Sequence, residues 1–151
     1  MKYILPIVLT SFACGAHVHD DWTTIHQVHP DTHEIVHLAS SHSNNRDAML
    51  TIQCDRRLTL YELGTNLKGV RIENVEYSLD YGEYVDVKSY TEMLGYRSVF
   101  VHTITERSYS QIIARDILSF KVTSVEGETE IYTFSLNGVD EAYHTLMDLC
   151  E

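Results

Sequence analysis

The amino-acid sequence predicts an all-β domain, a β-sandwich or a partly open barrel, with two short helices, one of them C-terminal. Apolar and polar residues alternate with a period of two in many short segments rich in Val, Ile, Thr and Tyr, as half-buried strands do. Turn-forming residues separate these segments at short intervals, which is typical of sandwiches and small barrels. Only two segments carry apolar residues at helical spacing.

The first half of the chain predicts two hairpins. Residues 22–28 and 34–39 are expected strands, and Pro30 stiffens the turn between them. The polar residues that follow predict a loop. This loop covers residues 40–47. Beyond it, residues 49–54 and 58–63 are expected strands on either side of a short charged turn at residues 55–57.

The second half predicts two more hairpins and both helices. Gly82 is expected to supply the positive φ of the first hairpin turn. Asp140 is expected to cap the final helix, with Ala142, Leu146 and Cys150 on one stripe. The expected strands are residues 75–79, 84–88, 98–103, 117–123 and 129–136, and the other helix is residues 108–115.

Residues 1–16 have the features of a signal peptide. Lys2 precedes an apolar core at residues 3–13, about half the length that a membrane-spanning helix needs. Small residues follow at positions 14–16, where a signal peptidase would cut. The sequence therefore predicts a periplasmic or secreted protein with one β-rich domain over residues 17–151, of which residues 17–21 are expected to be disordered. A buried N-terminal strand is the alternative for the apolar core.

Cys14 raises a second alternative, because lipoprotein signals end in a small residue before an acylated cysteine. Ala13 fits that pattern, but the two positions before it do not. Lipidation at Cys14 would make the protein membrane-anchored, and membrane contact is expected only in that case.

Cys54 and Cys150 remain after the predicted cut, and an even pair in an oxidising compartment predicts a disulfide. The bond would close a loop of about a hundred residues and stabilise the fold by about 4 kcal/mol. Two buried free thiols are the alternative.

The formal net charge of −11 constrains the choice of partner. An acidic surface repels phosphate backbones and anionic headgroups, so we expect no nucleic-acid binding.

Four segments together resemble the small exported VasI-like proteins associated with type VI secretion, and related short periplasmic proteins of unknown role. Two departures are Ser78-Leu79, where an Arg is usual, and the histidine-rich start. The resemblance implies an exported, non-enzymatic accessory or binding protein with an unidentified protein partner in the cell envelope. It implies no cofactor. The segments are Leu50-Thr-Ile-Gln-Cys54, Thr59-Leu-Tyr61, Val75-Glu-Tyr-Ser-Leu-Asp80 and Phe134-Ser-Leu-Asn-Gly-Val-Asp-Glu-Ala142, the last continuing to Cys150.

His33-Glu34-Ile35-Val36-His37 matches the zinc-protease pattern His-Glu-x-x-His. On a helix the two imidazoles would share a face and Glu34 would activate a zinc-bound water. His42 and Glu62 are the candidates for a third ligand. The β-branched pair Ile35-Val36 favours a strand instead, on which the two histidines lie about 13 Å apart. A zinc hydrolase is therefore an alternative rather than the expected function.

Seven of the nine histidines lie between His17 and His42, so a periplasmic Cu- or Zn-binding protein is a further alternative. If cleavage follows Ala16, the new N-terminus with His17 and His19 supplies nitrogen ligands that Cu(II) prefers. His26 and His29 are candidates for a weak zinc site. A solvated N-terminus with incidental histidines is the competing interpretation.

Overall fold

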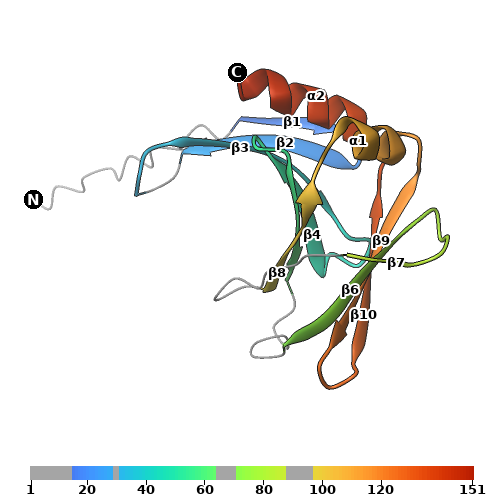
Figure 1. The fold of residues 1–151 in the computed structure, drawn as a ribbon. Helices are drawn as coiled ribbons and strands as arrows, with labels where there is room; N and C mark the ends of the chain where they lie inside the picture. Colours follow the sequence, from blue (N-terminus) through green and yellow to red (C-terminus); the bar gives the residue numbers. More distant parts are fainter. Residues whose placement is uncertain (1–14, 29–30, 64–70, 88–96) are drawn as a thin grey trace, which may run out of the picture.

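The computed structural model describes residues 15–28, 31–63, 71–87 and 97–151. In these residues the chain forms ten strands in two antiparallel sheets and two helices, one of them C-terminal (Figure 1). The predicted all-β class with two short helices is confirmed, and the sheets do not close into a barrel. Within the same ranges, neither helix is long and apolar enough to cross a membrane.

The larger sheet has six strands in the order β1-β2-β3-β4-β5-β8. Its first five strands follow one another along the chain as hairpins, and β8 closes the far edge against β5. The strands are β1 (Gly15–His19), β2 (Trp22–Val28), β3 (Ile35–His42), β4 (Ala48–Gln53), β5 (Arg57–Glu62) and β8 (Arg97–Thr103).

The smaller sheet has four strands in the order β10-β9-β6-β7. They are β6 (Ile72–Leu79), β7 (Val85–Asp86), β9 (Ile117–Ser124) and β10 (Thr129–Ser135). Helix α1 (Glu106–Ile113) precedes β9, and helix α2 (Val139–Leu149) ends the domain. Thr105 caps α1 in a capping box with Ser108.

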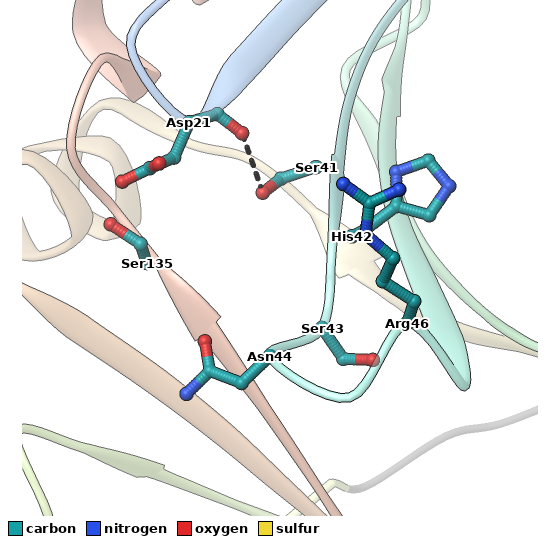
Figure 2. Close-up of a pocket in the computed structure, with 7 residues that line it drawn as sticks. All are labelled: Asp21, Ser41, His42, Ser43, Asn44, Arg46 and Ser135. Carbon is teal, nitrogen blue, oxygen red and sulfur yellow. Dashed lines mark hydrogen bonds between the residues drawn. The ribbon is translucent and has the colours of Figure 1, made fainter.

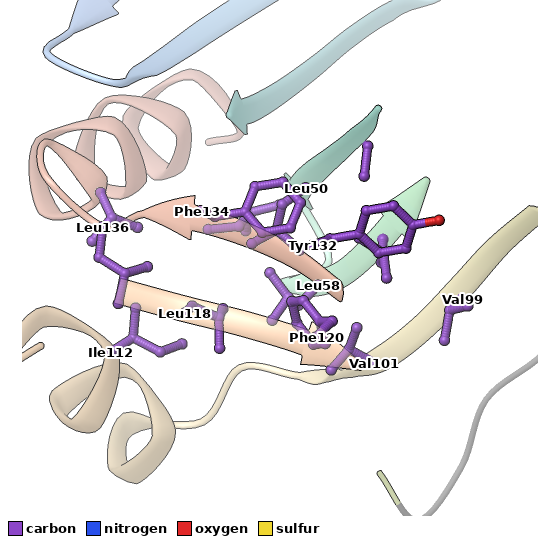
Figure 3. Close-up of a cluster of buried hydrophobic side chains, with 14 of the residues drawn as sticks. Leu50, Leu58, Val99, Val101, Ile112, Leu118, Phe120, Tyr132, Phe134 and Leu136 are labelled. Carbon is purple, nitrogen blue, oxygen red and sulfur yellow. The ribbon is translucent and has the colours of Figure 1, made fainter. Parts of the chain in front are cut away.

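Two layers cover one face of the six-stranded sheet, which we call the inner face. Helix α2 lies over β1–β3 (Figure 1), where the Thr24 hydroxyl donates to the Ala142 carbonyl at 3.1 Å. The four-stranded sheet covers β4 and β5, and between the two sheets lies the core (Figure 3). Phe120 and Phe134 meet there edge to face at 6.2 Å, opposite Leu50 and Leu58.

Two buried polar contacts join the sheets. Trp22 donates its indole N–H to the Ser135 carbonyl at 3.0 Å, and Tyr132 donates its hydroxyl to the Glu62 carboxylate at 2.6 Å. Burial, and then the bond to Glu62, raises the pKa of Tyr132 well above its usual value, so this phenol stays protonated. Both contacts satisfy groups that would destabilise the core if left unpaired.

Several strand boundaries differ from those predicted. Strand β3 continues to His42 instead of ending at Ala39, because Ser40 and Ser41 pair with β4 and are buried. Strand β7 is only Val85–Asp86. The predicted corner at Pro30 and the end of the predicted strand at Lys88 lie outside the described residues.

Two turn assignments are corrected. The N-cap of α2 is Gly138, at φ 87°, and Asp140 lies within the first turn of the helix, so Asp140 is not the cap. In the β6–β7 turn, the positive φ values belong to Asp80 and Tyr81 and not to Gly82. Aspartate tolerates this region because its short side chain forms local hydrogen bonds.

Residues 17–21, for which the sequence predicts a disordered tail, form part of a hairpin in the structure. His17–His19 belong to β1, which pairs with β2 from Gly15↔His26 to His19↔Trp22, and a tight turn at Asp20 follows. The backbone hydrogen bonds of this hairpin and the cover of α2 outweigh the polar composition of the segment. Gly15 and Ala16, assigned to the signal peptide, are the first two residues of β1, and residues 1–14 lie outside the described ranges.

Asp80 ties the β6–β7 turn to the start of β9. Its carboxylate accepts hydrogen bonds from the backbone N–H groups of Ile117 and Asp116, each at 2.9 Å, and lies 3.6 Å from Arg115. The bond from Ile117, followed by that from Asp116, lowers the pKa of Asp80 below 3.8. The charged carboxylate therefore stabilises the folded state.

We expect Asp80→Asn to lower the melting temperature at neutral pH and to have less effect in acid. The folded-state pKa lies below the unfolded value, so the contribution is complete above the unfolded pKa, near 3.8, and is lost as the pH falls towards the folded pKa. Melting curves of both proteins from pH 7 to pH 2.5 should converge at the acid end. Asp116→Asn, at the exposed neighbouring carboxylate, is the matched control, and a constant gap between parent and Asp80→Asn would contradict the assignment.

Candidate functional site

A polar cavity of about 320 Å³ opens where three separate turns and strand ends meet (Figure 2). The β1–β2 turn, the end of β3 with its following turn, and the end of β10 supply its walls. The lining residues are Asp21, Ser41, His42, Ser43, Asn44, Arg46 and Ser135.

Hydrogen bonds hold the walls in place. The Ser43 hydroxyl donates to the Asp47 carboxylate at 2.7 Å and accepts from the backbone N–H groups of Asp47 and Ala48. The backbone N–H of Asn44 donates to the Thr133 carbonyl at 2.9 Å, which fixes the turn to β10. Arg46, which has φ 59° in the same turn, also lines the cavity.

The cavity suits hydrogen bonding to a small polar molecule better than it suits catalysis. Asp21 and Arg46 supply opposite charges, and His42 and Asn44 supply an imidazole and an amide, all on exposed residues. The Ser41 hydroxyl, however, donates to the Asp21 carbonyl at 2.8 Å. A catalytic serine needs a hydrogen bond to a base such as histidine. Among the serines that line the cavity, none forms a hydrogen bond to a histidine.

The segment His33–His37 does not form the helix that a zinc hydrolase needs. His33 lies in a turn at φ 58°, and β3 begins at Ile35. Glu34 is exposed, and its backbone N–H donates to the Thr32 hydroxyl. The β-branched residues after Glu34 pair with β2, which explains why strand formation prevails over helix.

The proposed third ligands of that motif also lie apart from it. His42 lines the polar cavity, and Glu62 is buried against Tyr132 in the core. In the described ranges, no group of three His, Cys, Asp or Glu side chains is placed so that it could hold a metal ion.

Three other histidines come together on the inner face. His26 on β2 is directly opposite His37 on β3, with ring centroids 6.0 Å apart, and His17 on β1 lies 6.4 Å from His26. We call His17, His26 and His37 the histidine row. His19 shares β1 with His17, and the pairing of this strand with β2 engages the backbone that a square-planar N-terminal copper site would use.

His26 was a candidate from the sequence, with His29, which lies outside the described residues, but the contact of His26 with His37 does not follow from the sequence pattern alone. The two strands were predicted, but their pairing depends on where the intervening turn ends, and a one-residue slip would place the two side chains on opposite faces. Apart from His42, which was a candidate zinc ligand, the residues of the polar cavity were missed because they are distant in sequence. Their only signal was the turn-forming residues at Asp20-Asp21 and Asn44-Asn45.

A polar cluster joins the two helices. The Tyr109 hydroxyl donates to the Asp140 carboxylate, and His144 lies 3.2 Å from Tyr109 and 3.4 Å from Asp140. Burial, and then the bond to Asp140, raises the pKa of Tyr109 above its usual range, so this phenol stays protonated. The ring of Tyr143 packs on Tyr109 at 4.6 Å, and the cluster thus clamps α1 to α2.

Cys54 and Cys150 lie at disulfide distance, with their Cα atoms 5.6 Å apart. Cys54 follows β4 and Cys150 caps α2, so the pair joins the end of the helix to the sheet.

Comparison with known proteins identifies a fold and no family. No protein-family model matches the sequence, and no curated relative matches it. Among solved structures, the chain is similar to invasion associated protein B from Bartonella henselae, with a TM-score of 0.64 and 12% sequence identity. The similarity covers 89% of this chain and 96% of that one. The shared architecture therefore extends over nearly the whole of both chains.

Proposed function

We propose that this protein is an exported, non-enzymatic accessory protein that binds a protein partner at the cell envelope. The features of residues 1–16 support export. The resemblance to VasI-like proteins and the fold shared with an invasion associated protein support an accessory role. The exposed edge of the six-stranded sheet carries the proposal.

Strand β1 is the first strand of that sheet, and in the described residues it pairs only with β2. An edge strand presents backbone N–H and C=O groups that an extended segment of another protein can bind. On the outer face of the sheet, opposite α2, four apolar side chains continue inward from this edge. They are Val18, Ile25, Val36 and Leu38, which we call the outer patch.

The outer patch is open to solvent at the edge and more covered further in. Val18 is 71% exposed and Val36 37% exposed, whereas Ile25 and Leu38 are half-buried. With a net charge of −11, the protein favours a basic partner. The expected partner segment is therefore a strand that alternates apolar with Lys or Arg side chains.

Site-specific photo-crosslinking from position 18 in the native host tests this function. A crosslinker at Val18 should capture one exported partner, and one at Ile131, 52% exposed on the edge strand β10, should not. Val18→Asp should weaken binding of the identified partner about tenfold or more, because a charge replaces buried apolar area, and Ile131→Asp should not. Binding should also weaken as salt rises.

Two results would contradict the proposal. One is equal capture from positions 18 and 131. The other is a captured partner whose binding is unchanged by Val18→Asp.

A further inference from the structure

The polar cavity is lined by two opposite charges that do not pair with each other. The Asp21 carboxylate comes from the turn between β1 and β2, and the Arg46 guanidinium from the turn between β3 and β4. In the described part of the chain, neither side chain forms an ion pair or a hydrogen bond. Figure 2 shows the two side chains on different sides of the cavity, so a molecule held in it lies between a negative and a positive group.

The three serine hydroxyls of the cavity differ in what they offer to such a molecule. The Ser43 hydroxyl is saturated, because it donates to a carboxylate and accepts from two backbone N–H groups. The Ser41 hydroxyl donates to the Asp21 carbonyl and keeps a lone pair that can accept. The Ser135 hydroxyl accepts from the Asn137 N–H at 3.1 Å and keeps its own proton to donate. Ser43 therefore builds the wall, while Ser41 and Ser135 present an acceptor and a donor.

The side chain of Asn44 completes this set. Its amide forms no hydrogen bond among the described residues, and it carries both a donor and an acceptor, as a peptide group does. The cavity volume of about 320 Å³ lies at the small end of the range for ligand sites. The lining thus suits a small molecule with a positive group, a peptide group and a negative group.

We propose that the polar cavity binds a dipeptide with free termini, its ammonium group at Asp21, its carboxylate at Arg46 and its peptide group at Asn44. A guanidinium holds a carboxylate by two parallel hydrogen bonds, and an ammonium donates charge-assisted bonds to a carboxylate. A free amino acid carries its two charges on neighbouring carbon atoms and reaches one side of the cavity only, whereas a peptide bond separates the charges of a dipeptide. A ligand with no net charge is also not repelled by a protein of net charge −11, as an anion would be.

This site is independent of the proposed partner surface. None of the residues that line the cavity belongs to the outer patch. Loss of partner binding would therefore leave dipeptide binding intact, and the two proposals can fail separately.

NMR titration of the purified, oxidised full chain with three probes tests the site. The probes are alanyl-alanine, its N-acetyl form, which lacks the ammonium group, and its C-terminal amide, which lacks the carboxylate. Alanyl-alanine should shift the backbone amide signals of Asn44 and Ser135, and leave that of Gly127 in the distant β9–β10 turn in place. Each blocked form should bind about tenfold more weakly or worse, because it loses a charge-assisted hydrogen bond.

Two substitutions should reproduce these losses one charge at a time. Asp21→Asn should weaken binding of alanyl-alanine about tenfold and leave binding of the N-acetyl form unchanged. Arg46→Gln should weaken binding of alanyl-alanine by a similar factor and leave binding of the C-terminal amide unchanged. Asp20→Asn and Arg56→Gln are matched controls, because they make the same charge changes at exposed turn residues outside the cavity lining. Both controls should bind all three probes as the parent does.

The unchanged binding of one blocked form to each variant also shows that its cavity is folded. The proposal is wrong if alanyl-alanine shifts neither Asn44 nor Ser135, or if a blocked form binds the parent as tightly as alanyl-alanine does. It is equally wrong if Asp20→Asn or Arg56→Gln weakens binding as much as its partner in the cavity, since the effect would then come from the overall charge of the protein.

Discussion

Replacing both Cys54 and Cys150 by alanine is expected to lower the free energy of unfolding by about 4 kcal/mol, because the bond removes chain entropy from the unfolded state. The two residues are 96 positions apart, so the closed loop is most of the domain. They also anchor the C-terminal end of α2, the helix that covers the inner face of β1–β3. Urea unfolding of the parent and the double variant measures the difference.

Reduction should reproduce the effect in the parent and leave the double variant unchanged. Thiol titration of the denatured, unreduced parent should find neither Cys54 nor Cys150 free. A parent whose urea midpoint does not move on reduction would show that the pair contributes nothing to stability.

The strands of this protein could be predicted because most have one face buried and one exposed. The hairpin of β9 and β10 shows this clearly: Phe120, Val122, Tyr132 and Phe134 point to the core, and the residues between them do not. Burial on one face imposes the period of two, and that period is visible in the sequence. The two helices were predicted for the equivalent reason, a stripe of apolar residues at helical spacing.

Strand β1 could not be predicted because this source of information is absent. It lies at an edge, and His17 and Val18 are both exposed, so neither face carries a marked pattern. The division of the strands between two sheets also depends on long-range pairing, such as β5 with β8 and β6 with β9. Local sequence carries little information about such contacts.

The candidate sites were harder still to predict. The polar cavity combines Asp21, Asn44 and Ser135, and the histidine row combines His17, His26 and His37. Each set is assembled by strand register. A sequence motif such as His33-Glu34-x-x-His37 is visible without register, and the structure shows that its helix does not form.

The start of α2 depends on a glycine for two separate reasons. Gly138 has φ 87°, which is unfavourable for residues with a Cβ. A Cβ there would also collide with the carbonyl oxygen of His19 and lie 2.7 Å from its carbonyl carbon. The obstacle is backbone in the β1–β2 hairpin, so it cannot move aside as a flexible side chain would.

Gly138→Ala is therefore expected to destabilise the protein by roughly 3 kcal/mol, from about 1–2 kcal/mol for the left-handed backbone and a further 1–3 kcal/mol for the forced displacement. Gly127→Ala is a close control, because Gly127 has φ 86° and a Cβ there would meet nothing within 4 Å. Gly127→Ala should therefore lower the free energy of unfolding only by the backbone contribution of about 1–2 kcal/mol. Urea unfolding of the two variants measures the difference, which isolates the contact of α2 with the hairpin. Equal destabilisation of the two variants would show that α2 and β1 shift apart freely, and that the inner face of β1–β3 is not held rigid by its helix.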